Sequence, residues 1–353
     1  MRDPIHGSAP LGDARQPIHI RGQGGTVLHD PVADAQALAT HVEAEVAKQL
    51  VGQGELVRQV VITLLCGGHC LVEGTPGLGK TLLVRTLGQA LGIEFSRIQF
   101  TPDLMPTDIV GTNVYNPAAA GEARQLRFEP GPIFAGLVLA DEINRATPKT
   151  QSALLEAMEE GQVTVGQTTH KLPDPFFVLA TQNPLEMEGT YPLPEVQLDR
   201  FFFKVGVGYP TPDELRRIVE ATTSGTPAEV QRVTTADELM RARAVVRELP
   251  IASYVRDYAA RLVLATQPGQ KSAPRPVKQY VTFGASPRGA QALILAAKAR
   301  ALLDQRYNVG FADIRAVALP ALRHRIKRNL AGEVAGISTD ELIRAVLEHV
   351  YEE

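Results

Sequence analysis

The eight residues GTPGLGKT, at positions 74–81, demand a particular setting in any fold that contains them. Glycines at positions 74, 77 and 79 let backbone N–H groups converge on phosphate oxygens. A strand-like run (CLVE) precedes the loop and a helix-like run (KTLLVRTLGQAL) follows it, which is the context that a phosphate-binding loop requires. The candidate nucleotide-binding residues are therefore Gly74, Thr75, Pro76, Gly77, Leu78, Gly79, Lys80 and Thr81.

A second apolar run, LVLADE at residues 137–142, ends in two adjacent carboxylates. Carboxylates this close repel each other and are costly to desolvate, so a cation has to compensate for them. We expect Mg²⁺ with ATP, held by the hydroxyl of Thr81 and, through the water shell of the metal, by Asp141. Lys80 would reach the β and γ phosphates, and Glu142 would polarise the attacking water.

Further polar residues complete the candidate catalytic set. Asn183 ends a third strand-like run (FFVLATQN), where its amide can orient the attacking water. Arg200 stands between a short acidic helix and an apolar strand, and Arg288 lies in the first turn of a helix capped by Ser286, where an anion is favoured. Taken singly, either arginine is equally compatible with a surface salt bridge. Arg145 is expected at a subunit interface or in a salt bridge with the acidic helix EAMEE.

The order of strand-like and helical runs indicates the fold class. From residue 70 to residue 183 the two types alternate, which predicts an α/β fold: a mostly parallel sheet with helices on both faces. Two excursions, residues 112–128 and 161–172, would project from that sheet. From Thr211 the pattern is helical, with capping-box starts at TPDEL, TADEL and STDEL. The expected parts are a mobile arm (1–30), an α/β domain (31–208) and a smaller helical domain (209–353).

Composition bears on partners and location. The 353 residues carry a net charge of −3, and 44% are hydrophobic, which argues against a general nucleic-acid or lipid-surface binder. No apolar run approaches the roughly 18 residues that a membrane span needs. The first residues, MRDPIHGSAP, lack the apolar stretch of a secretory leader, so we expect a cytoplasmic protein.

Two local patterns are interpreted as structural. Cys66 and Cys70 flank His69, but no third and fourth metal ligands stand at a suitable spacing, so we expect buried thiols. The basic run RHRIKR, residues 323–328, stands at the end of a helix, whose dipole favours positive charge there, and contains no aromatic residue. A nucleic-acid partner is therefore not expected.

Taken together, the motifs resemble those of the MoxR-type AAA+ ATPases, in the clade with a helix-2 insert and a pre-sensor-1 hairpin. The resemblance rests on GTPGLGKT, LVLADEINRA, KTQSALLEAMEEGQVTV, FFVLATQNP, GTYPLPEVQLDRF and GASPRG, and runs from about Val51 to the end. It implies a P-loop NTPase sheet followed by an all-α lid. It also implies that Asn183 is the first sensor, that Arg200 is a finger reaching the neighbouring subunit's nucleotide, and that Arg288 is the second sensor.

The same resemblance implies partners. Members are typically hexameric rings, chaperone-like motors that mature or activate other proteins, often beside partners with a von Willebrand factor A domain. The two excursions correspond to the helix-2 insert and the pre-sensor hairpin, which magnesium-chelatase motors and minichromosome maintenance helicases share. Gly79 stands where many members have alanine, and the arm before residue 31 resembles nothing in the family.

These inferences converge on one expected function with two alternatives. We expect a Mg²⁺-dependent ATPase that assembles as a ring and remodels a protein partner. The main alternative is a motor that acts on nucleic acid or on a chelatase-like complex, although residues 162–172 offer only His170 and Lys171 for nucleic-acid contacts. The other alternative is a nucleotide-gated assembly scaffold, which would not need a catalytic base, a sensor and an arginine finger together.

Overall fold

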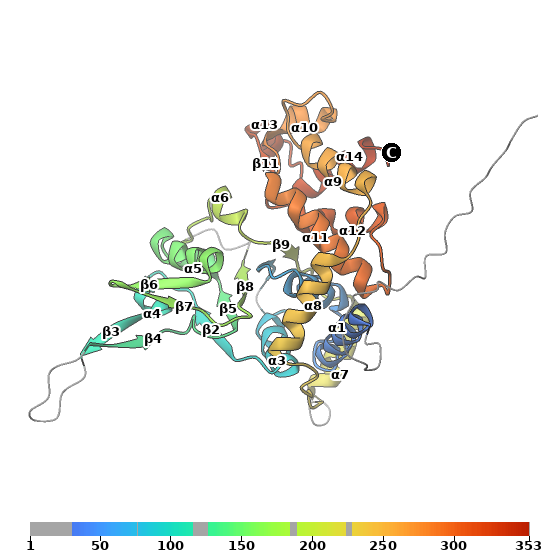
Figure 1. Ribbon diagram of the computed structural model, residues 1–353. Helices are drawn as coiled ribbons and strands as arrows, with labels where there is room; N and C mark the ends of the chain where they lie inside the picture. Colours follow the sequence, from blue (N-terminus) through green and yellow to red (C-terminus); the bar gives the residue numbers. More distant parts are fainter. Residues whose placement is uncertain (1–29, 76, 116–125, 184–188, 224–227, 353) are drawn as a thin grey trace, which may run out of the picture.

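A computed structural model describes residues 30–75, 77–115, 126–183, 189–223 and 228–352. A five-stranded parallel sheet lies at the centre of the first half, in the order β2-β5-β8-β1-β9 (Figure 1). Its strands are β1 (Cys70–Glu73), β2 (Phe95–Gln99), β5 (Leu137–Asp141), β8 (Phe177–Gln182) and β9 (Phe203–Gly206). The predicted parallel α/β sheet is therefore confirmed, and β8 lies between the strand that leads into the glycine-rich loop and the strand that ends in the carboxylates.

Helices cover both faces of this sheet. They are α1 (Pro31–Ala47), α2 (Gly54–Leu65), α3 (Lys80–Leu91), α4 (Pro106–Val110), the 3₁₀ helix η1 (Ile143–Arg145) and α5 (Pro148–Glu160). The short helix α6 (Glu195–Leu198), which precedes β9 in the chain, contains no buried residue. Successive side chains of a strand point to opposite faces, so each strand feeds two cores. Leu71 and Val138 pack with α4 and α5, whereas their neighbours Val72 and Leu139 pack with α1, α2 and α3.

Two antiparallel hairpins project from the α5 side of the sheet (Figure 1). The first consists of β3 (Gly111–Tyr115) and β4 (Leu126–Pro130), and the second of β6 (Gln162–Val165) and β7 (Thr168–Lys171). The rings of Phe128 and His170 stack at a centroid distance of 3.8 Å, which fastens one hairpin to the other. Both expected excursions are hairpins, although residues 116–125, in the middle of the first, lie outside the described residues.

The second half of the chain is mainly helical. Its elements are α7 (Pro212–Thr223), α8 (Ala236–Glu248), α9 (Ser253–Ala265), α10 (Arg275–Tyr280), β10 (Val281–Phe283), α11 (Pro287–Leu303), α12 (Phe311–Leu322), β11 (Lys327–Arg328), α13 (Leu330–Val334) and α14 (Thr339–His349). The three predicted capping boxes are present, each with its hydroxyl and its glutamate bonded reciprocally to the backbone. The helical pattern did not predict the short antiparallel ladder between β10 and β11.

The first helix joins the two halves. Val42 and Val46 of α1 are almost fully buried in an apolar cluster that also contains residues of α8, α11 and α14. The expected boundary near residue 208 stays a prediction, because this core runs across it. The expected arm, apart from Asp30, lies outside the described residues, and no helix of the described part is long and apolar enough to cross a membrane.

Candidate nucleotide-binding site

The glycine-rich loop runs from the end of β1 to the start of α3. Gly77 and Gly79 have φ angles of +83° and +76°, in the left-handed region that glycine adopts without strain. Lys80, the first residue of α3, is buried and donates from Nζ to the carbonyl of Gly74 at 2.8 Å. Burial lowers the pKa of Lys80, while the nearby carboxylates oppose that shift. Pro76, predicted as part of the loop, lies outside the described residues.

The carboxylate of Asp141 is held from two sides. Its Oδ1 accepts from the hydroxyl of Thr181 at 2.6 Å, and its Oδ2 accepts from Nη2 of Arg97 at 2.6 Å. Strand order explains both contacts, because β5 lies between β8, which carries the threonine, and β2, which carries the arginine. A hydroxyl and a guanidinium therefore compensate the charge at the end of an apolar strand.

Glu142 follows the end of β5 with a φ of +58°, an uncommon conformation for a residue with a side chain. Its backbone N–H donates to the Thr181 hydroxyl at 2.8 Å, which fixes that turn. Its Oε2 accepts from Nε2 of Gln99 at 2.9 Å and from Nη1 of Arg145 at 3.1 Å. Arg145 was expected at an interface or on the EAMEE helix, and its ion pair with Glu142 was not foreseen.

These groups line one cavity of about 260 Å³. The polar side chains there include the lysine and threonine of the loop, both carboxylates of the Asp-Glu pair and the predicted Asn183, which is buried at the tip of β8. The lining residues are Gly77, Gly79, Lys80, Thr81, Leu82, Arg97, Gln99, Asp141, Glu142 and Asn183. The sequence separates them by up to about a hundred positions, and the parallel sheet brings their strand ends to the same edge.

The two predicted arginines meet elsewhere. Nη2 of Arg200 lies 2.9 Å from Oε2 of Glu159, and Nη2 of Arg288 bonds the other oxygen of the same carboxylate. Arg200 also donates from Nη1 to the carbonyl of Leu155 at 2.8 Å. Ser286 caps α11 and accepts from the N–H of Arg288, as the sequence predicted. Neither arginine is among the residues that line the cavity of the described loop.

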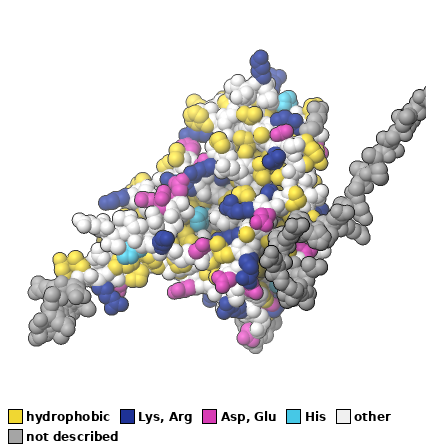
Figure 2. All heavy atoms as spheres, in the orientation of Figure 1, with side chains coloured by type: hydrophobic (Ala, Val, Ile, Leu, Met, Phe, Trp, Pro, Cys, Tyr) yellow, Lys and Arg dark blue, Asp and Glu magenta, His cyan; other side chains and the backbone are white. Residues whose placement is uncertain are grey.

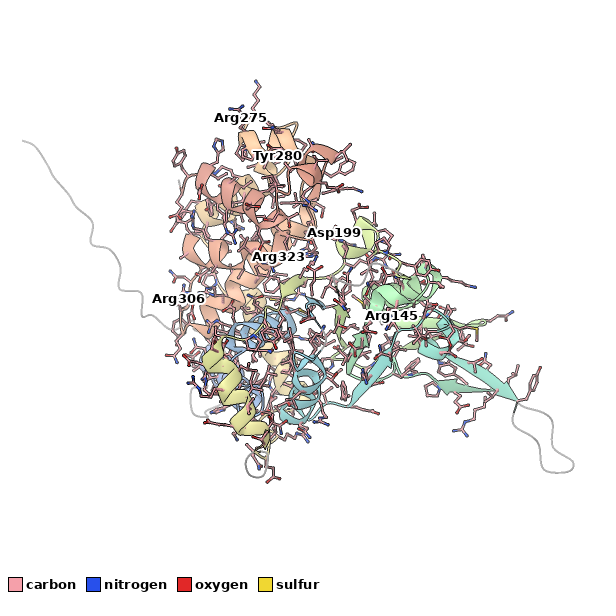
Figure 3. The ribbon with its side chains drawn as sticks, turned by 180° about the vertical axis from the view of Figure 1, so that it is seen from behind. Arg145, Asp199, Arg275, Tyr280, Arg306 and Arg323 are labelled. Carbon is pink, nitrogen blue, oxygen red and sulfur yellow. The ribbon has the colours of Figure 1, made fainter. Side chains whose placement is uncertain are left out.

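The basic run 323–328 is engaged in ion pairs. Two of its arginines and its lysine bond carboxylates on α14, on α6 and just after α6, whereas Arg328 donates to the carbonyl of Ile337 at 2.8 Å. Figure 3 shows Asp199 and Arg323 at this junction between α6 and the lid. These pairs are Arg323–Asp340, Arg325–Asp199 and Lys327–Glu195. These ion pairs agree with the structural interpretation of the run and go beyond complementing a helix dipole, and whether the run also binds a partner stays untested.

Several residues near the cavity were not found from the sequence. Gln53 donates from Nε2 to the carbonyl of Leu78 at 2.9 Å and so supports the loop from the start of α2. Arg97 and Gln99 stand two positions apart on β2, so their side chains share one face of the strand. The alternation of Arg97 and Gln99 with an apolar residue in FSRIQF was the available signal. The sequence did not show, however, which strand lies next to β2 in the sheet.

Comparisons with known proteins decide the family. Residues 69–203 match the ATPase family associated with various cellular activities (AAA), and residues 276–346 match the AAA lid domain. The chain is 41% identical to Chaperone MoxR1 of Mycobacterium tuberculosis over 347 residues, which cover 97% of this chain and 88% of that protein. The chain belongs to the MoxR family of AAA+ ATPases.

Further matches of this MoxR-family chain have similar coverage. Uncharacterized protein YeaC of Bacillus subtilis is 41% identical over 318 residues, 90% of this chain and 95% of that protein. The solved structure of a candidate ATPase from Cytophaga hutchinsonii superposes with a TM-score of 0.84 at 39% identity, covering 91% of this chain and 96% of the other. The predicted family, fold class and ATPase activity are confirmed, and the roles of individual residues stay predictions.

Proposed function

We propose that this MoxR-family chain hydrolyses ATP with Mg²⁺ in a hexameric ring, where arginines of one subunit complete the active site of the next. The division of the candidate residues into two groups carries the proposal. The phosphate loop, the two carboxylates and Asn183 line one cavity, whereas Arg200 and Arg288 meet at Glu159 and do not line it. A guanidinium that stabilises the transferring phosphoryl group comes from the same chain or from a neighbour.

A head-to-tail ring satisfies this division. In such a ring each subunit presents one surface to the next subunit and a different surface to the previous one. The pair of arginines on one surface then faces the cavity on the neighbour's other surface. Glu159 holds both guanidinium groups on the same side of the molecule, with their side chains 28% and 46% exposed, so both are available to an incoming subunit.

The oxygen ligands fit a magnesium ion. The hydroxyl of Thr81 and the carboxylate of Asp141 line the same cavity, and hard oxygen donors of this kind are what Mg²⁺ takes beside substrate phosphates. Thr81 and Asp141 would hold the metal, which would supply positive charge against the negative charge that develops on the phosphates. The chain contributes Lys80 as a further positive charge, and Thr181 and Arg97 hold the aspartate in place.

Glu142 serves as the general base in this proposal. Its carboxylate accepts a proton from the attacking water while the water oxygen bonds to the γ-phosphorus and the β–γ bridging oxygen leaves with ADP. Gln99 fixes the orientation of the carboxylate through its amide. The Asn183 amide, at the tip of the neighbouring strand, orients the water.

A second cavity beside the loop suits the purine base. It has a volume of about 770 Å³ and adjoins the loop, because Leu50 lines it and also lies against Gly79. The wall formed by α1, α2 and the turn between them contains four apolar side chains and three charged ones (Glu43, Glu55 and Arg58), and two charged residues of α7 form another wall. The lining residues are Glu43, Ala47, Leu50, Val51, Gly52, Gly54, Glu55, Val57, Arg58, Glu214 and Arg217.

The work of hydrolysis is proposed to act on a protein client. A relative with 41% identity is named a chaperone, and a von Willebrand factor A domain is the partner type that the family resemblance implies. The nucleic-acid alternative receives little support, because His170 is stacked on Phe128 and acidic and basic side chains are interspersed over the face in Figure 2. We propose the two projecting hairpins as the surface that contacts the protein client.

Mixing two inactive variants tests the shared active site. Arg200→Ala keeps the base but lacks the finger, with an expected loss of about 10³-fold or more, and Glu142→Gln keeps the finger but lacks the base, with a loss of about 10²-fold or more. In a ring assembled from equal amounts, about a quarter of the interfaces pair an intact base with an intact neighbouring finger. The mixture should therefore recover about a quarter of wild-type turnover.

The controls are the two single variants, shown by light scattering to form rings of wild-type size. If both are inactive and co-assemble, yet every mixing ratio stays inactive, Arg200 acts within its own subunit or only supports the fold.

A further inference from the structure

The side chain of Arg325 is only 3% exposed and lies in the junction between the lid and the segment that carries Arg200. Its Nε donates to Oδ1 of Asp199 at 2.8 Å, and its two terminal nitrogens donate to the carbonyls of Asp199, Phe201 and Phe202. A last bond, to Ala321, ties the guanidinium to α12. One lid arginine therefore binds the backbone on both sides of Arg200.

Neighbouring lid residues fasten the same segment. His324 contacts the carbonyl of Phe201 through Nε2 at 2.9 Å, and burial together with the charge of Arg325 lowers the pKa of this histidine well below 6.5. On the other side, the hydroxyl of Ser286 donates to Oδ2 of Asp199 at 2.8 Å. Ser286 is also the N-cap of α11, which carries Arg288, so the Asp199 carboxylate is shared between the two lid elements.

We propose that Arg325 and Asp199 are a positioning pair, which fixes the Asp199–Phe202 backbone to the lid so that Arg200 and Arg288 are presented together to the neighbouring subunit's nucleotide. The inference rests on the shared active site proposed above. It adds that the finger moves with the lid of its own subunit. The lid then sets whether the next subunit hydrolyses its nucleotide.

The chemistry of Arg325 suits this role better than that of lysine. A planar guanidinium has five N–H donors in a fixed fork, and here they meet acceptors at Asp199, Phe201, Phe202 and Ala321. An ammonium keeps the charge but cannot reach that set of acceptors. Burial lowers the pKa of Arg325 to about 10, so the group is still charged at neutral pH and needs the aspartate.

The test compares Arg325→Lys with a matched control, Arg323→Lys. Arg323 belongs to the same basic run and forms a two-point ion pair with Asp340, at 3.0 and 3.1 Å, within the lid. We expect Arg325→Lys to lower kcat by about 10²-fold, which is the effect of displacing a catalytic group by about 1 Å. We expect its affinity for a fluorescent ATP analogue and its ring size to stay at wild-type values, and Arg323→Lys to keep normal turnover.

Mixed rings separate positioning from a general loss of structure. Arg325→Lys mixed with Glu142→Gln should recover turnover, because the lysine variant has an intact base and its partner supplies a well-placed finger. Arg325→Lys mixed with Arg200→Ala should stay inactive, because neither variant supplies a well-placed finger. Asp199→Asn should give the same pattern by removing the other partner of the pair.

Each contrary outcome has a distinct meaning. Normal turnover of Arg325→Lys would overturn the positioning role. Failure of both Arg325→Lys and Asp199→Asn to assemble into rings would also overturn it, because the pair would then be needed for the fold itself. If Arg200→Ala and Glu142→Gln complement each other but Arg325→Lys and Glu142→Gln do not, the shared site stands and the positioning role falls. If the first mixture is itself inactive, the shared site fails and the positioning role fails with it.

Discussion

His69 makes the stability of the fold depend on pH. Its ring is buried just before β1, where Nδ1 accepts from the N–H of Val178 at 3.0 Å and Nε2 lies 3.1 Å from the carbonyl of Met158. Only a neutral ring with its proton on Nε2 satisfies both partners. Burial accordingly lowers the pKa of His69 from 6.5 to about 4.

The direction of the effect comes from proton binding. The folded chain binds this proton less tightly than the unfolded chain, so the stabilisation is complete above pH 6.5 and is lost as the pH falls toward about 4. Within this window the free energy of unfolding falls by about 1.4 kcal/mol per pH unit for one such group, or about 3 kcal/mol in total. His324, whose pKa also lies well below 6.5, adds a loss of the same sign.

Replacing His69 with Gln isolates its contribution. Urea unfolding of both proteins gives the free energy of unfolding at each pH, and the stability advantage of the wild type should shrink by about 2 kcal/mol between about pH 7.5 and pH 5. The glutamine amide does not titrate, and His324 cancels because both proteins keep it. An advantage that stays constant over this range would mean that His69 titrates normally in the folded chain, which would refute the reasoning.

Two further predictions concern the loop and the thiols. Lys80→Ala should weaken ATP binding by about 10- to 100-fold, since Lys80 supplies a charged donor to the phosphates; titration with a fluorescent ATP analogue checks this, and unchanged affinity would contradict the assignment of the loop. Cys66 and Cys70 are free and buried, and burial raises the pKa of both thiols, so neither should react with a thiol reagent at neutral pH until the chain is unfolded. Rapid labelling of the native protein would show that β1 and the end of α2 open readily.

Features that depend on short stretches of chain were predictable. The three capping boxes and the N-cap of α11 are each set by a few consecutive residues and are all present, and the described residues of the glycine-rich loop lead from β1 into α3 as predicted. The alternation of strands and helices likewise predicted a parallel sheet. Local backbone chemistry was sufficient in each case.

Features that depend on residues distant in the sequence were not predictable. The sequence could not show that β2 pairs with β5, so the contacts of Arg97 and Gln99 with the Asp-Glu pair were missed. Nothing in the sequence EAMEE indicates that Glu159 forms ion pairs with two arginines from different segments of the chain. The reach of Arg325 to Asp199 spans 126 positions, and only the packed lid brings the two together.

The burial of α1 changes what counts as a separable piece of this protein. Ala39, Val42 and Val46 share one core with α8 and α11, although about two hundred residues of chain lie between them. A fragment cut near residue 208 would expose that apolar stripe to water, and a lid expressed alone would lose the surface that covers α8. Boundaries chosen by sequence order would therefore divide one apolar core, and we expect a truncated lid to need the first helix to keep that core covered.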